Sequence, residues 1–151
     1  MDLRKRVEVC FTPGEYTYFK DEFHTVVVID VLRATSAICT AFAHGVAAII
    51  PVPTIEEALV YKQQGFLAGA ERKGQIVDGF DFGNSPFSYM KEEFRGQEIV
   101  LTTTNGTKSL DVAKEAPQVV VGSFLNLDAL CQWLLAQAGD ILCLCSGWQD
   151  K

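Results

Sequence analysis

Residues 25–30, with the sequence TVVVID, form a continuous run of β-branched side chains that ends at an acid. A strand that is apolar on both faces needs cover on both faces, which is typical of a central strand in a parallel sheet. Arg33 follows closely, and residues 34–44 favour a helix that ends before Gly45, a common residue just after a helix. The segment therefore predicts a buried strand that delivers the carboxylate of Asp30 to a strand-to-helix turn.

The rest of the chain repeats this alternation of apolar runs and helix-forming segments. The apolar runs predict further strands at residues 6–10, 47–52, 66–70, 97–102, 118–122 and 140–145, and the segments between them predict helices at residues 54–65, 85–95, 108–115 and 126–138. This order predicts an α/β fold, a layered sandwich with a largely parallel or mixed sheet flanked by helices. Because no helix follows the last predicted strand, we expect residues 1–151 to form a single α/β domain that is truncated at its C-terminal end or completed by another segment or chain.

Local signals indicate where several elements begin. Thr54, followed three residues later by Glu57, predicts a capping box, and Ser85 before Pro86 predicts an N-cap. Asn126 is the predicted cap of the last helix. Residues 71–85 are rich in acids and glycines and show no sustained period, so they predict a long loop, which in a compact domain is usually functional or disordered.

Charge and composition exclude several classes of partner. The formal charge is −6 and no stretch is dense in Lys or Arg, which argues against nucleic acid. The chain has no run of about 18 apolar residues and no signal-peptide core, so we expect a cytoplasmic protein without a membrane partner. The five cysteines are odd in number and include no C-x-x-C pair, which argues against a disulfide framework or a zinc site.

Polar residues follow three of the predicted strands. Because the carboxyl ends of parallel strands meet at one edge of a sheet, we expect these residues to share a ligand. They are Asp30, Arg33, Glu71, Arg72, Thr103, Thr104 and Asn105, joined by Asp78, Asp81, Asn84 and Ser85 from the long loop. Carboxylates from separate segments suit Mg²⁺, which prefers a few oxygen ligands. The two arginines and the hydroxyl-rich turn at residues 103–107 suit an anion.

Each of these motifs also has an ordinary structural interpretation. A lone Asp at a strand end is more often a turn or cap residue than a ligand, and residues 71–73 resemble a solvated loop. Familiar phosphate-binding motifs are absent, since Gln75 and Ile76 stand where a P-loop requires Lys and Ser or Thr, and no G-x-G-x-x-G is present. The recurrence of polar residues at three strand ends nevertheless favours a binding site.

Five short motifs near these strand ends occur in a fixed order. They are DVLRATS at residues 30–36, GAER at 69–72, GFDFGNSP at 79–86, TTTNGT at 102–107 and GSFLN at 122–126. Together they resemble the 2-phosphosulfolactate phosphatase family. The resemblance implies a Mg²⁺-dependent phosphoric monoester hydrolase that converts 2-phosphosulfolactate into 3-sulfolactate and phosphate, a step toward coenzyme M. Family members are longer, so the resemblance covers the N-terminal part of the family sequence.

The resemblance also implies roles for individual residues. Catalytic roles fall to Asp30, Arg33, Glu71 and Arg72, and metal-ligand roles to Asp30, Glu71 and Asp81, with Asp78 in reserve. Substrate-binding roles fall to Thr35, Ser36, Asn84, Ser85, Thr103, Thr104, Asn105, Gly106 and Thr107. Direct attack by water on the phosphoryl group is the expected mechanism, with a phosphoenzyme at Asp30 as the alternative.

Two hypotheses about function stay open at this point. The first is the phosphatase, whose partner is a small anionic phosphorylated substrate; the identity of the ester and the presence of a homodimer are left open. The second is a non-catalytic anion-binding or assembly module made from a truncated copy of such an enzyme. Release of phosphate from a phosphorylated hydroxy acid, with and without Mg²⁺, separates the two.

Overall fold

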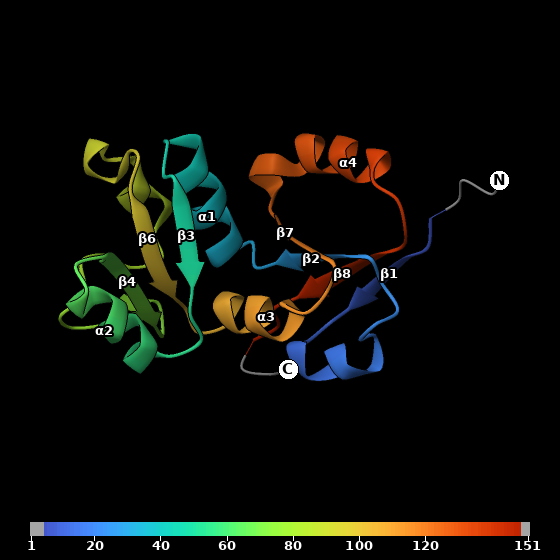
Figure 1. Cartoon of the computed structure of the whole chain (residues 1–151), viewed down its shortest axis with the longest axis horizontal. Helices are drawn as coiled ribbons and strands as arrows, with labels where there is room; N and C mark the ends of the chain where they lie inside the picture. The colour runs from blue at the N-terminus through green and yellow to red at the C-terminus, as the bar shows by residue number, and fades with distance from the viewer. Residues whose placement is uncertain (1–4, 149–151) are drawn as a thin grey trace.

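The computed structural model describes residues 5–148, and the strands in that range form two four-stranded sheets (Figure 1). The first sheet has the order β1 (Val7–Cys10), β8 (Ile141–Cys145), β2 (Thr25–Ile29) and β7 (Gln118–Gly122), and all its neighbouring strands are parallel. The second has the order β3 (Ala48–Pro51), β6 (Glu98–Thr102), β4 (Leu67–Arg72) and β5 (Gln75–Ile76), and only its β4–β5 pair is antiparallel. The predicted α/β fold is confirmed, although the strands are divided between two sheets.

Four α-helices connect the strands within residues 5–148: α1 (Ala34–Ala43), α2 (Ile55–Gln63), α3 (Gly106–Ala113) and α4 (Leu127–Ala136). Figure 1 shows the two sheets side by side, with α3 between them. α3 contacts β2 of the first sheet and β3 of the second, and α1 packs against β7 and against the 3₁₀ segment Pro86–Met90. These two helices join the sheets, and they begin just after β2 and β6 end.

The prediction of a buried central strand at residues 25–30 is confirmed. β2 pairs with β7 on one side and with β8 on the other. Val26, Val27 and Val28 are at most 2% exposed, so both faces of the strand are covered. The site at the end of this strand therefore stands on a rigid support.

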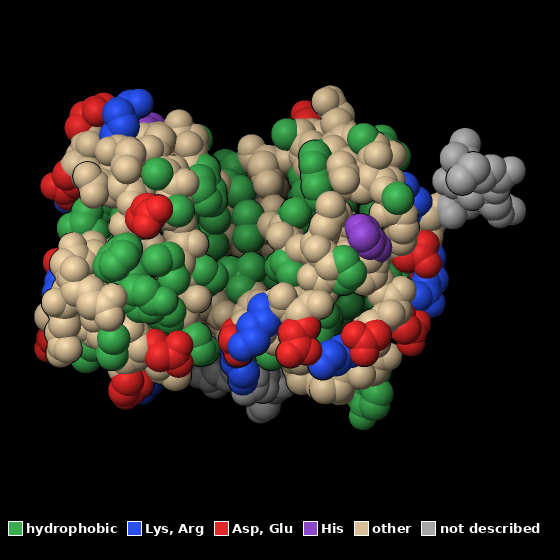
Figure 2. Space-filling view, in the orientation of Figure 1, with side chains coloured by type: hydrophobic (Ala, Val, Ile, Leu, Met, Phe, Trp, Pro, Cys, Tyr) green, Lys and Arg blue, Asp and Glu red, His purple; other side chains and the backbone are tan. Residues whose placement is uncertain are grey.

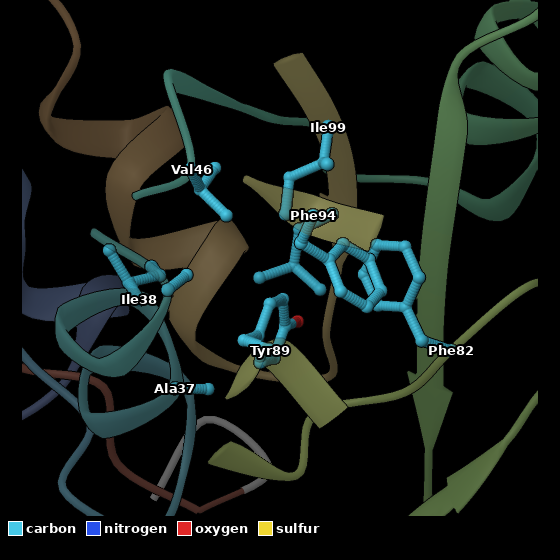
Figure 3. Close-up of a cluster of buried hydrophobic side chains, with 9 residues drawn as sticks. Ala37, Ile38, Val46, Phe82, Tyr89, Phe94 and Ile99 are labelled. Atoms are coloured by element: carbon cyan, nitrogen blue, oxygen red, sulfur yellow. The ribbon is translucent and has the colours of Figure 1, made fainter. Parts of the chain in front are cut away.

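The predicted helix at residues 85–95 is wrong, because this segment forms two 3₁₀ turns, Pro86–Met90 and Glu92–Phe94. Tyr89 and Phe94 are both buried and pack against Phe82, with Phe82 and Phe94 ring centroids 5.0 Å apart (Figure 3). Residues five apart point about 140° away from each other on an α-helix, so a continuous helix would not aim both rings at this cluster. The extended backbone at Lys91 breaks the helix and brings both rings into the core.

The predicted loop at residues 71–85 contains a β-hairpin that the sequence analysis missed. β4 and β5 pair with Arg72 opposite Gln75, and Lys73 and Gly74 form the two-residue turn between them, with φ of 55° and 80°. Two positive φ values are typical of a type I′ turn, for which Asn-Gly is the usual sequence signal. A Lys-Gly turn lacks that signal, so the hairpin was not predicted.

The predicted caps are confirmed in part. The Thr54 hydroxyl accepts a hydrogen bond from the Glu57 N–H at 3.1 Å, as expected for the start of α2. Ser85 occupies the N-cap position, as predicted, but of a 3₁₀ turn, and it makes no side-chain cap hydrogen bond. Asn126 is the N-cap residue of α4, as predicted, but it makes no side-chain cap hydrogen bond there; its side chain accepts one from the Ser123 N–H at 2.9 Å in the capping box of the preceding 3₁₀ turn.

An apolar groove of about 450 Å³ runs between the two sheets and their helices (Figure 2). Its lining includes Ile49 from β3, Val119 from β7, Phe42 from α1 and Trp133 from α4. None of the α4 residues is buried, although the helix has the sequence LDALCQWLLA. No helix of the described residues is long and apolar enough to cross a membrane.

Candidate active site

A pocket of about 570 Å³ opens where strands of both sheets end. Its lining consists of Asp30, Leu32, Arg33, Glu71, Lys73, Gly74, Asn84, Thr104, Asn105 and Trp148. Asp30 follows β2 of the first sheet, whereas Glu71 lies near the end of β4 and Thr104 follows β6 of the second. Ligands in open α/β folds bind beyond the carboxyl ends of the strands, and the pocket occupies such a position between the two sheets.

Asp30 lies at the N-termini of two helices. Burial raises the pKa of Asp30 above its ordinary value, and hydrogen bonds from the backbone N–H groups of Ala34 and Gly106 oppose this increase. The negative charge of Glu71 raises the pKa of Asp30 further. Helix N-termini favour anions, and at the starts of α1 and α3 the anion is the carboxylate of the chain itself.

The close approach of α3 to Asp30 requires a glycine at the first helical position. A Cβ atom on Gly106 would lie 2.4 Å from the Cβ of Ala34 and 3.0 Å from Oδ2 of Asp30. The first of these distances is far shorter than a van der Waals contact, so a larger residue would push the two helix starts apart. Gly106 thus positions a backbone N–H beside the carboxylate.

Two predicted substrate-binding hydroxyls of the β2–α1 turn are used inside the fold. The fully buried Thr35 hydroxyl accepts a hydrogen bond from the Asp30 N–H at 3.1 Å and donates one to the Gly122 carbonyl at 2.7 Å. The Ser36 hydroxyl donates to the Val31 carbonyl at 2.7 Å. Neither side chain lines the pocket, and Thr35 ties the Asp30 backbone to the end of β7.

The turn at residues 103–107 divides into an inner and an outer part. The hydroxyls of Thr103 and Thr107 each accept a hydrogen bond from the other residue's N–H, at 3.2 and 3.0 Å, and both residues are buried. Thr104 and Asn105 are only half-buried and line the pocket. The inner pair shapes the turn, and the outer pair is available to a ligand.

Glu71 is held by two turns of the chain. It is 7% exposed, and its carboxylate accepts hydrogen bonds from the Gly74 N–H and, at 3.4 Å, from the Thr104 hydroxyl. The first contact belongs to the β4–β5 hairpin and the second to the segment between β6 and α3. These donors fix the carboxylate in the same pocket as Asp30.

The basic residues of the pocket differ from those that the sequence predicted. Arg33 lines the pocket, and its Nη2 donates a hydrogen bond to the Gly74 carbonyl at 3.2 Å. Arg72 does not line it, because its guanidinium donates to the Glu71 carbonyl at 2.7 Å and to the Thr102 hydroxyl at 3.0 Å. Lys73, next along the hairpin turn, lines the pocket instead.

Asp81, predicted as a metal ligand, lies elsewhere. Its carboxylate accepts a hydrogen bond from the Ala68 N–H at 3.0 Å and forms an ion pair with Lys62. Burial by itself would raise the pKa of Asp81, but these two partners lower it below its ordinary value. Ala68 and Glu71 are three residues apart on β4, so Asp81 is about 10 Å along the strand from the pocket carboxylates. The reserve residue Asp78 is exposed, and neither it nor Ser85 lines the pocket.

Asn84 supplies a third oxygen to the pocket lining. The side chain is 4% exposed, and its Oδ1 accepts no hydrogen bond from the described part of the chain. The segment is anchored on both sides by the aromatic cluster, since Phe82 and Tyr89 are buried and the Tyr89 hydroxyl donates to the Gly83 carbonyl at 2.9 Å. A buried acceptor without a donor is unfavourable unless a ligand satisfies it.

The acidic wall of the pocket, formed by Asp30 and Glu71, offers oxygen donors to a cation. Residues 5–148 contain no cluster of three or more His, Cys, Asp or Glu side chains that would hold a metal ion. The donors present are the carboxylates of Asp30 and Glu71 and the amide oxygen of Asn84. This small set of oxygen donors fits Mg²⁺, which keeps several waters and few protein ligands.

Two kinds of lining residue were missed by the sequence analysis. Lys73 and Gly74 lie in a turn without the usual Asn-Gly signal, although Lys73 directly follows the quoted GAER motif. Leu32 and Trp148 are apolar and exposed, and Trp148 lies three residues beyond the end of β8. The position of Trp148 shortly after a predicted strand was the sequence feature that could have indicated its place in the pocket lining.

Comparison with known proteins gives matches over most of the chain. A sequence model of the family described as 2-phosphosulpholactate phosphatase matches residues 10–151. The chain is 49% identical over 130 residues to a probable 2-phosphosulfolactate phosphatase of Thermotoga maritima, an alignment that covers 86% of this chain and 56% of the relative. It is 42% identical over 148 residues to a protein of the same name from Carboxydothermus hydrogenoformans, covering 97% of this chain and 60% of the relative.

The comparisons also define how much of a relative the chain represents. A probable 2-phosphosulfolactate phosphatase of Clostridium acetobutylicum is 40% identical over 145 residues, which cover 94% of this chain and 62% of the relative. The chain therefore spans a little over half the length of the curated relatives that it matches.

Proposed function

The chain belongs to the 2-phosphosulpholactate phosphatase family, and from that premise we propose that its pocket hydrolyses the phosphate monoester of a small anionic hydroxy acid. The relatives' names point to 2-phosphosulfolactate as the ester, with 3-sulfolactate and phosphate as products. The observation that carries the proposal is the convergence of Asp30 and Glu71, from two different sheets, in one pocket with Arg33. An acidic chain needs such local positive charge to bind an anionic substrate.

We expect Mg²⁺ to bind at the acidic wall. Asp30 and Glu71 would hold the ion with their carboxylates, and Asn84 would give it the oxygen that lacks a hydrogen-bond donor. When bound, the ion polarises a phosphoryl oxygen and offsets the charge that develops during phosphoryl transfer.

The chain's own residues bind and orient the ester. The planar guanidinium of Arg33 suits two phosphoryl oxygens at once, and its contact with the Gly74 carbonyl restricts its position. The outer residue Asn105 contributes an amide to the same anion, while the Thr104 hydroxyl donates its hydrogen bond to Glu71. Arg72 donates hydrogen bonds to Glu71 and Thr102, so we propose that it stabilises the end of β4 and does not bind the ester.

Direct attack by water on the phosphoryl group is the mechanism that we propose. Asp30 lines the pocket, and its pKa, which burial and Glu71 raise in the ion-free chain, would fall once a cation binds beside it, so that the carboxylate is ionised at the reaction centre. The alternative is attack by Asp30 itself to form an acyl phosphate. Turnover in ¹⁸O-water separates the two, since label in an Asp30-containing peptide would contradict direct attack by water.

Release of phosphate from 2-phosphosulfolactate tests the proposed function. We expect the purified chain to release phosphate when Mg²⁺ is present and to lose that activity when the ion is chelated. A folded chain that binds the ester without releasing phosphate would instead support a non-catalytic anion-binding module.

A further inference from the structure

Lys73 occupies a backbone conformation that a lysine rarely adopts. Its φ is 55°, and it is the first of the two central residues of the β4–β5 turn, where Asn, Asp or Gly is normally found. A side chain with a Cβ atom is disfavoured in this left-handed region. A residue that is kept in an unfavourable conformation at the mouth of a pocket suggests a function for its side chain.

The ammonium group of Lys73 is also unusual in having no partner among residues 5–148. No hydrogen bond or ion pair joins it to residues 5–148, and the side chain is exposed at the pocket. Other lysines of this acidic chain do have carboxylate partners, such as Lys20 with Glu115 at 2.7 Å and Lys114 with Asp111 at 3.0 Å. The positive charge of Lys73 is therefore available to a ligand.

The turn that carries Lys73 also holds the other cation of the pocket. Arg33 donates to the carbonyl of Gly74, the second central residue of the turn, at 3.2 Å. The hairpin turn thus carries Lys73 and accepts a hydrogen bond from Arg33 of the β2–α1 turn, whereas Arg72 is bonded to its neighbours. Among the described residues, the basic side chains of the pocket lining are Arg33 and Lys73.

We propose that Lys73 determines the substrate specificity of this pocket by binding an anionic group that the substrate carries in addition to its phosphate. The division of roles follows from the two side chains. A guanidinium binds two phosphoryl oxygens in a fixed plane, whereas an ammonium on a flexible stem is a point charge that suits a sulfonate or carboxylate at a variable distance. The inference rests on the proposed phosphatase function, and it adds that an ester without a second anionic group gains little from Lys73.

The test compares two esters on the same variants. One is 2-phosphosulfolactate, and the other is ethyl phosphate, which has no second anion. Lys73→Gln should raise KM for 2-phosphosulfolactate about five- to tenfold with little change in kcat, and its effect on KM for ethyl phosphate should be much smaller, about twofold or less. Lys73→Arg keeps the charge and should restore most of the loss, and Lys114→Gln, an exposed lysine remote from the pocket, is the matched control.

Equal effects of Lys73→Gln on the two esters, or no effect on either, would overturn the proposal. A wild-type chain that hydrolyses neither ester would contradict the proposed function but leave the role of Lys73 measurable. In that case, titration with 3-sulfolactate, followed through the fluorescence of Trp148 in the pocket, gives the affinity directly. Tighter or equal binding by Lys73→Gln would then reject the inference, and a five- to tenfold weaker affinity would support it.

Discussion

Asp30 follows β2 of the first sheet and Glu71 lies near the end of β4 of the second, yet they line one pocket and the charge of Glu71 raises the pKa of Asp30. Two carboxylates that repel each other in a partly buried pocket are unfavourable in the absence of a cation. The same two carboxylates are the proposed metal ligands. Asn84 adds a neutral oxygen to them, which does not increase their repulsion.

Removal of the Glu71 charge should lower the pKa of Asp30. The folded pKa of Asp30 lies above its unfolded value, so its contribution to stability is complete below the unfolded pKa and is lost as pH rises through the folded pKa. In Glu71→Gln the stability contribution of Asp30 should be lost at lower pH, because its folded pKa lies closer to its unfolded pKa. NMR titration of the Asp30 carboxyl carbon in the metal-free chain measures the change, with Glu98→Gln as the control. An unchanged or higher pKa of Asp30 would contradict the coupling.

Gly106→Ala should destabilise the chain. The added Cβ would lie 2.4 Å from the Cβ of Ala34, so the start of α3 must move away from α1, at a cost of about 1–3 kcal/mol. Gly14→Ala is the control, because its nearest contact would be an ordinary 3.8 Å. Chemical denaturation of both variants measures the difference, and equal stabilities would argue against the close approach.

Thr35→Val should reduce stability by about 1–3 kcal/mol, because it leaves the Asp30 N–H without its acceptor and the Gly122 carbonyl without a donor. Thr35→Ser retains the hydroxyl and should lose less. The KM of either variant should stay close to that of the wild type, since Thr35 does not line the pocket. A raised KM with unchanged stability would support the sequence-based prediction that Thr35 contacts the substrate.

Lys73→Asn should stabilise the folded chain by about 1 kcal/mol, because Asn tolerates a positive φ far better than Lys does. Thermal unfolding of the two proteins gives the difference, and Lys114→Asn provides a comparison outside the turn. A lower midpoint temperature for Lys73→Asn would mean that Lys73 stabilises the hairpin. Its unfavourable conformation would then have a structural explanation.

The regular elements were predictable because hydrophobic pattern and burial agree in them. The run at residues 25–30 has one physical solution, a strand covered on both faces, and β2 adopts it. The sequence also brought Asp30, Arg33, Glu71, Asn84, Thr104 and Asn105 together correctly, since each lines the pocket. Polar side chains just beyond the carboxyl ends of parallel strands lie at one edge of the sheet, where such a pocket forms.

The irregular segment at residues 71–95 was not predictable in the same way. Its path is set by tertiary packing, because Phe82, Tyr89 and Phe94 share one cluster that no local period indicates (Figure 3). The hairpin reverses the chain, so Asp81 returns to the beginning of β4 while Glu71 remains near its end. Sequence spacing alone therefore gave no means of separating the loop residues that reach the pocket from those that do not.

The most direct test of the central claim is a double-mutant cycle on phosphate release from 2-phosphosulfolactate, with Asp30→Asn, Glu71→Gln and the double variant. If the two carboxylates act as one site, each single change should lower kcat/KM by about 100-fold or more, and the double variant should be little worse than the single ones. Stability of Asp30→Asn should stay within about 1 kcal/mol of the wild type, because the lost N–H contacts are offset by relief of the raised pKa. If the reductions in kcat/KM of the two single variants multiply in the double variant, the account is contradicted. It is also contradicted if loss of folding stability accounts for the reduced kcat/KM.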